Sequence, residues 1–247
     1  MRVFDETIRK TSALLSESEP RVYKFIPGGS AREGKKNELI MDRDSAFELG
    51  AAALGSVNYS LFTNERELVP RDEILLYGRE LYELKNDSDF ARITVILTDD
   101  IEENGEQGAY AIIKDIEMKK FEVSPEGYMM RVSALSNREQ VRVSKAAVKS
   151  KLSFEQVGNL FIEKYKQNSH VLAVKVIFIT LPDAPYEEMD VLATTAVNIT
   201  KALNHIIADM NMDCSHCGWK PVCDEVEGLK EMHFKASRNS EKNNKEE

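Results

Sequence analysis

The sequence has few cysteines, no long apolar runs and no clustered basic residues, and each shortage excludes a class of protein. No stretch approaches the roughly 18 apolar residues of a membrane-spanning helix, so we expect no membrane span. Residues 1–16 alternate charged and apolar side chains, unlike a secretory signal. The net charge of −9 disfavours nucleic-acid binding, because phosphate neutralisation needs clustered lysine and arginine. We therefore expect a cytoplasmic protein without nucleic-acid or membrane partners.

Only three cysteines are present, and Cys214, Cys217 and Cys223 lie within ten residues of one another. An odd, clustered set without a secretory signal argues against a disulfide framework and for a reducing compartment. In the pattern Cys-x2-Cys-x5-Cys, the first two thiolates can share one centre, and Gly218 permits the tight backbone that this needs. The spacing predicts a metal site, either a [4Fe-4S] cluster or zinc. The alternative interpretation is three reduced thiols in a loop.

A fourth ligand is not supplied by the cysteines. His233 lies ten residues beyond Cys223, and a short helix between them could fold it back onto the metal. His216 lies inside the first loop, where steric constraints oppose binding to the same metal. An iron–sulfur cluster could also keep an open iron or take a thiolate from another protein. The other two histidines, His170 and His205, are interpreted as structural, since one opens a strand and the other lies on a long helix.

Segments with strand and helix patterns alternate along the chain, which predicts a mixed α/β fold with a sheet flanked by helices. The β-branched run at 92–98 and the apolar run at 171–181 are the strongest strand signals. The sequence Ser153-Phe-Glu-Gln156 is a capping box that opens a helix. We further expect strands at 38–42, 57–63, 73–77 and twice within 128–143, and helices at 3–16, from Ser45, at 106–119, 154–167 and 187–211.

Composition divides the chain into three parts. Residues 1–182 form the expected α/β domain, and 183–235 add the long helix and the cysteine segment as an appendage. Residues 236–247 are polar throughout and are expected to be a disordered tail.

Several segments occur in an order that resembles one known family. They are the Gly-rich basic loop at 27–36, Ser45-Ala-Phe-Glu-Leu49, the strand at 92–98, Glu126-Gly-Tyr, the run 138–145, the helix at 157–166 and the cysteine run. Together they resemble the middle region of the acetyl-CoA synthase subunit of the carbon monoxide dehydrogenase/acetyl-CoA synthase complex, the beta subunit of archaeal acetyl-CoA decarbonylase/synthase. The resemblance covers roughly residues 20 to 225.

The resemblance implies that the cysteine run holds the [4Fe-4S] part of the family's nickel-containing centre. Cys214, Cys217 and Cys223 match its first three cysteines, although the last gap is shorter here. The fourth cysteine has no counterpart, since Lys230 occupies that region, and the downstream Cys-Gly-Cys that carries the distal nickel is absent. We therefore expect no complete nickel site on this chain alone.

The resemblance also implies coenzyme A as a ligand, because the family's middle domain is associated with arginines that bind it near a tryptophan. Arg131, Arg138 and Arg142 fall in the corresponding stretch and could contact phosphates bidentately. No tryptophan lies there, and an ordinary solvated strand face is the favoured alternative.

The resulting hypothesis is a truncated acetyl-CoA synthase-like protein of anaerobic one-carbon and acetyl-CoA metabolism, accessory or partial in role. Its expected partners are proteins of the carbon monoxide dehydrogenase/acetyl-CoA synthase type or corrinoid proteins. The alternative hypothesis is a non-catalytic iron–sulfur or zinc protein in electron transfer, sensing or structure.

Overall fold

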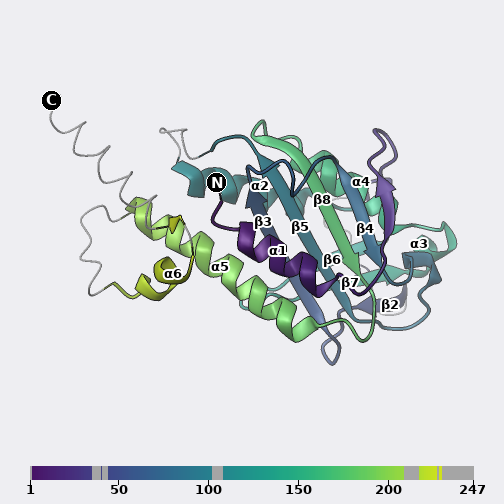
Figure 1. Cartoon of the computed structure of the whole chain (residues 1–247). Helices are drawn as coiled ribbons and strands as arrows, with labels where there is room; N and C mark the ends of the chain where they lie inside the picture. The colour runs from purple at the N-terminus through teal and green to yellow at the C-terminus, as the bar shows by residue number, and fades with distance from the viewer. Residues whose placement is uncertain are drawn as a thin grey trace, which may run out of the picture.

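The computed structural model describes residues 2–34, 40, 44–101, 108–208, 217–226 and 228–229. Within them the chain forms a five-stranded sheet, a three-stranded sheet and helices on both sides of the larger sheet (Figure 1). The mixed α/β class expected from the sequence is confirmed at this level.

The larger sheet has the strand order β1-β4-β8-β5-β3 and mixes parallel with antiparallel pairs. Its two parallel pairs are β4 with β8 and β3 with β5, while β1 with β4 and β5 with β8 are antiparallel. The strands are β1 Arg21–Lys24, β4 Glu73–Tyr77, β8 Val171–Ile179, β5 Phe90–Thr98 and β3 Ser56–Thr63. Strands β3 and β5 are buried along their whole length, which explains the continuous apolar and β-branched character of β5.

The smaller sheet is antiparallel, in the order β2-β7-β6, with β2 Ser45–Leu49, β7 Glu139–Ser144 and β6 Tyr128–Val132. The two strands expected within 128–143 are confirmed. The helix expected from Ser45 is wrong, because this segment is strand β2 and pairs with β7. Its side chains alternate, with Phe47 and Leu49 buried and Glu48 half-buried, as a strand with one packed face requires. The strand expected at 38–42 falls mostly outside the described residues.

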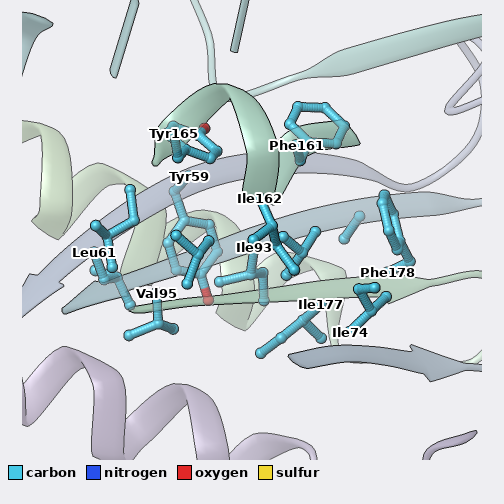
Figure 2. Packing of buried hydrophobic residues seen from close by; sticks show 14 of the residues in the cluster. Tyr59, Leu61, Ile74, Ile93, Val95, Phe161, Ile162, Tyr165, Ile177 and Phe178 are labelled. Atoms are coloured by element: carbon cyan, nitrogen blue, oxygen red, sulfur yellow. The ribbon is translucent and has the colours of Figure 1, made fainter. Parts of the chain in front are cut away.

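Two helices cover one face of the larger sheet and one covers the other. Helices α1 Asp5–Leu14 and α5 Tyr186–Ala208 lie together across the first face, and α4 Phe154–Tyr165 packs on the second (Figure 1). Figure 2 shows Phe161 and Tyr165 of α4 on one side of the sheet, with Val95 and Ile177 on the other. The remaining elements are α2 Gly108–Met118, α3 Lys145–Lys149, α6 Lys220–Glu225 and the short 3-10 helices η2 Leu81–Glu83 and η3 Lys119–Glu122.

The start of α4 has the capping box read from the sequence. The Ser153 hydroxyl accepts a hydrogen bond from the Gln156 amide at 3.1 Å, and the Gln156 side chain accepts one from the Ser153 amide at 3.1 Å. These two hydrogen bonds pair backbone amides that the N-terminus of a helix otherwise leaves without a partner.

Helix α5 shares its core with the larger sheet. Its buried side chains belong to the same apolar cluster as those of β3, β5 and α1; they are Met189, Leu192, Ala193, Ala196, Ile199, Ala202 and Leu203. Leu229, beyond the cysteines, is also fully buried in this cluster. The long helix that the sequence assigned to an appendage therefore packs on the sheet as a core element.

A fully buried ion pair joins the two sheets. The Arg92 guanidinium on β5 donates to both carboxylate oxygens of Glu139 on β7, at 3.0 and 2.6 Å. Arg92 also donates to the Thr94 hydroxyl at 3.3 Å and stacks over the Phe161 ring at 4.2 Å. The Asn58 amide of β3 donates to the same carboxylate. Burial acts to lower the pKa of Arg92, but the Glu139 carboxylate outweighs it, so the pKa is raised and the guanidinium stays charged.

Candidate metal centre

Two of the three cysteines lie in the described residues, next to the short helix α6. Cys217 precedes this helix, and its carbonyl accepts a hydrogen bond from the Lys220 amide at 3.1 Å. Cys223 lies within the helix, and its amide donates to the Trp219 carbonyl at 3.1 Å. Both thiols are free of disulfides and half-buried. This turn and helix hold the two cysteines on one compact segment, as the predicted ligand loop requires.

The structure brings His205 to this segment, although the sequence interpretation left it as structural. His205 lies in the last turns of α5, which contacts α6, and its Nε2 is 3.4 Å from the Cys217 sulfur. This distance fits a hydrogen bond between the thiol and the imidazole. It is also close to the separation of about 3.5 Å between a histidine nitrogen and a thiolate on one tetrahedral zinc, given bond lengths of about 2.0 and 2.3 Å.

The sequence held a weak signal for His205, which stands nine residues before Cys214 on a helix that leads directly into the cysteine run. Helical periodicity placed it on α5 but could not show that α6 folds back against the end of that helix. His170, by contrast, opens β8 as expected, and its Nδ1 lies 3.0 Å from the Asp99 carboxylate.

The remaining predicted ligands cannot be placed. Cys214, His216 and His233 lie outside the described residues. Within the described ranges, no group of three or more histidine, cysteine, aspartate or glutamate side chains is arranged to hold a metal ion. Of the predicted thiolate ligands, Cys217 and Cys223 lie in the described residues, and His205 lies 3.4 Å from the Cys217 sulfur.

Two of the three candidate coenzyme A arginines meet at one carboxylate on the smaller sheet. Arg131 of β6 forms an ion pair with Glu48 of β2. Arg142 of β7 stands opposite Glu48 in the strand register, with 3.8 Å between their charged groups, and donates to the Ile40 carbonyl at 3.1 Å. A phosphate at this position would have to compete with Glu48 for both guanidinium groups.

Arg138 is used differently from the other two arginines. Its guanidinium donates to the backbone carbonyls of Gly50, Ala51 and Leu54, at 3.3, 2.9 and 3.0 Å. These bonds fasten the loop after β2 to the start of β7. The geometry gives Arg138 a role in holding that loop, and coenzyme A binding by the three arginines stays a prediction.

Comparison with known proteins adds no family. No family model matches the chain, and no curated protein matches it. The resemblance to acetyl-CoA synthase therefore rests on the order of segments in the sequence. As for membranes, the described helices include none that is both long and apolar enough to cross a bilayer.

Proposed function

We propose that the protein binds a thiolate-ligated metal centre at the C-terminal end of α5. Cys214, Cys217 and Cys223 supply the thiolates, and His205 takes the fourth position that the sequence analysis gave to His233. The observation that supports this most directly is the 3.4 Å separation of the His205 nitrogen and the Cys217 sulfur. Three thiolates and one imidazole are a common ligand set of structural zinc.

This separation also favours one metal ion over a cluster. In a [4Fe-4S] cluster each iron takes its own protein ligand, so the cluster itself stands between ligands on different irons. Two ligand atoms only 3.4 Å apart suit a single zinc ion better. The [4Fe-4S] cluster is supported instead by the order of segments shared with acetyl-CoA synthase.

The identity of the metal separates the two functional hypotheses. A [4Fe-4S] cluster would support an accessory or partial acetyl-CoA synthase-like protein, working with carbon monoxide dehydrogenase or corrinoid partners in the cytoplasm. Zinc would support the non-catalytic alternative, in which the centre fixes the end of α5 for a structural or sensing role. The Cys-x2-Cys-x5-Cys pattern supports both hypotheses equally.

The test is metal and sulfide analysis of protein purified without oxygen. We expect either one zinc ion per chain or iron with an equal amount of sulfide, and loss of that metal in a Cys214→Ala/Cys217→Ala/Cys223→Ala variant. His205→Ala should weaken metal affinity at least about tenfold, because it removes a ligand. His170→Ala is the matched control and should bind as the wild type does.

Two results would change the proposal. If the triple cysteine variant retains its full metal content, the three cysteines are not the ligands and the proposal is wrong. Metal retained by His205→Ala but lost by His233→Ala would return the fourth position to His233, as the sequence first indicated.

A further inference from the structure

A cavity of about 420 Å³ lies along the edge of the larger sheet formed by β3. Helices α2 and α5 form two of its walls, and the turn at 133–137 between β6 and β7 forms a third. Asn58 and Ser60 of β3 line it from the sheet. This volume falls within the range of about 300 to 1,000 Å³ typical of small-molecule sites.

The charged side chains around this cavity are mostly basic. Lys114, Lys120 and Lys201 line it, and Glu117 is the only acidic residue among the described lining side chains. Lys114 and Glu117 neutralise each other in an ion pair of 2.6 Å. Lys120 and Lys201 have no carboxylate partner among the described residues. The described lining therefore carries three lysines and one carboxylate, in a chain whose net charge is −9.

The surroundings of Lys120 increase the demand for an anion. This lysine lies in η3, just after α2, and near the buried Arg92–Glu139 pair. Burial lowers the pKa of Lys120 and the positive charge of Arg92 lowers it further, while the carboxylates of Glu117 and Glu139 act in the opposite direction. The net effect lowers the pKa, and a bound anion would offset it.

A hydroxyl donor is available at the same place. Ser60 is only 7 % exposed, and within the described part of the structure its Oγ makes no hydrogen bond of full geometry, with the buried Tyr165 hydroxyl as a nearby candidate partner. A buried polar atom without a partner is unfavourable unless something in the cavity bonds to it.

We propose that this cavity binds a small phosphate-bearing metabolite, with Lys120 and Lys201 contacting the phosphate and Ser60 donating to it. A phosphate monoester carries a charge of about −1.5 to −2 at neutral pH, which balances the two unpaired lysines. Lysine ammonium groups bind phosphate as point charges and need no fixed bidentate geometry. Tyr110, also in the lining, offers an aromatic surface to the rest of the molecule. The proposal is independent of the metal centre.

Competitive acetylation of the intact protein tests this inference, with inorganic phosphate as the probe and mass spectrometry as the readout. Phosphate should slow acetylation of Lys120 and Lys201 at least about threefold, while sodium chloride at the same ionic strength should not, since it supplies only screening. Lys149, an exposed residue on α3, is the internal control and should react equally in both salts.

Calorimetric titration with inorganic phosphate gives a second readout. Lys120→Gln and Lys201→Gln should each weaken binding at least about tenfold, which is the effect of losing about 1.4 kcal/mol. Lys149→Gln should bind as the wild type does, and Lys120→Arg should retain most of the affinity because it keeps the charge. Equal protection by chloride, or unchanged phosphate affinity in both glutamine variants, would overturn the proposal.

Discussion

The Arg92–Glu139 pair and the Cys217–His205 contact both join elements that are distant in the chain, but the protein surrounds them differently. Arg92 and Glu139 are 0 % exposed, and further bonds from Asn58 and to Thr94 satisfy their polar atoms. Cys217 is half-buried, and its sulfur lies 3.4 Å from the His205 nitrogen. Polar groups whose hydrogen bonds are all made within the protein suit a structural role. A nitrogen and a sulfur held close together at a half-buried position suit a binding role.

The same contrast separates two regions of the molecule. The body, from α1 to the end of α5, is held by one apolar core that includes both faces of the larger sheet. In its described part, the segment after α5 contributes a short helix with partly buried side chains and the fully buried Leu229 to that core. Stability should therefore depend on the body, and metal binding on the segment.

Truncation gives the largest expected effect. A chain ended after Leu181 loses α5, and four large side chains of its described part are buried: Met189, Leu192, Ile199 and Leu203. Their burial contributes about 6 to 12 kcal/mol, at about 1.5 to 3 kcal/mol each. This equals the whole stability of a typical domain. We expect no cooperative thermal transition by circular dichroism.

The matched control for this truncation ends after Ala208 and keeps α5. It should retain a cooperative transition at a lower temperature, because among the described residues it loses Leu229 and the partly buried side chains around α6 from the core. If the shorter chain also unfolds cooperatively, residues 1–182 form a domain without α5, as the composition of the sequence suggested.

Removal of one charge from the buried pair should give the next largest effect. Glu139→Gln leaves the Arg92 guanidinium without a counter-ion at a site that is 0 % exposed. Breaking a buried pair in this way typically destabilises a protein by about 3 to 5 kcal/mol. Urea unfolding should show this loss, and Glu19→Gln, at an exposed position before β1, should change stability by less than about 0.5 kcal/mol. A loss below 1 kcal/mol in Glu139→Gln would show that the pair does not hold the sheets together.

Alkaline pH should weaken the body through its buried tyrosines. Burial raises the pKa of Tyr59, which shares a hydrogen bond of 2.9 Å with Thr11 of α1. The unfolded chain therefore loses this proton near pH 10 while the folded chain keeps it, so the free energy of unfolding falls as pH rises above 10. Each such tyrosine contributes a slope of about 1.4 kcal/mol per pH unit.

The variant Tyr59→Phe removes that proton from both states. The free energy of unfolding should then fall less steeply with pH above 10, by about 1.4 kcal/mol per pH unit for the one proton removed. Urea unfolding between pH 9 and 11 measures this slope. Tyr82→Phe, at an exposed position, should keep the wild-type slope. An unchanged slope in Tyr59→Phe would mean that Tyr59 ionises equally easily in the folded protein.

The sequence allowed most of the body to be predicted, because local patterns specify it. Strands β5 and β8 carry long apolar runs, and α4 carries its own cap. Strand β2 was missed, since five residues of mixed character fit a helix start equally well until they pair with β7, about ninety residues later. The same limit applies to α5, whose apolar stripe was visible but whose contact with β3 was not.

The candidate metal centre was likewise predictable only in part from the sequence. The spacing of the cysteines is a local property and could be read directly from the sequence. The approach of His205 to Cys217 depends on how α6 folds against α5, which no local pattern encodes. The cavity beside β3 is similar, because its lysines come from separate segments that only the fold brings together.

The smallest expected effect on stability is that of His205→Ala in metal-free protein. His205 is half-buried, and its described side-chain contact is the one with Cys217. Loss of such a contact on a partly exposed helix face should change the free energy of unfolding by less than about 0.5 kcal/mol, since alanine also has the higher helix propensity. Urea unfolding with a chelator present measures this change in the free energy of unfolding. The control is Asn198→Ala, another substitution on α5.

Added metal should then separate His205 from the control. A metal that binds only the folded state stabilises it by about 2.7 kcal/mol when its free concentration is 100 times the dissociation constant. The wild type and Asn198→Ala should gain this stability at that zinc concentration, while His205→Ala should gain much less because its affinity is lower. A loss of 2 kcal/mol or more in metal-free His205→Ala would instead make this histidine structural, as its place on the long helix first suggested. Both the Arg92–Glu139 pair and the Cys217–His205 contact would then have a structural role, and the contrast between them would be lost.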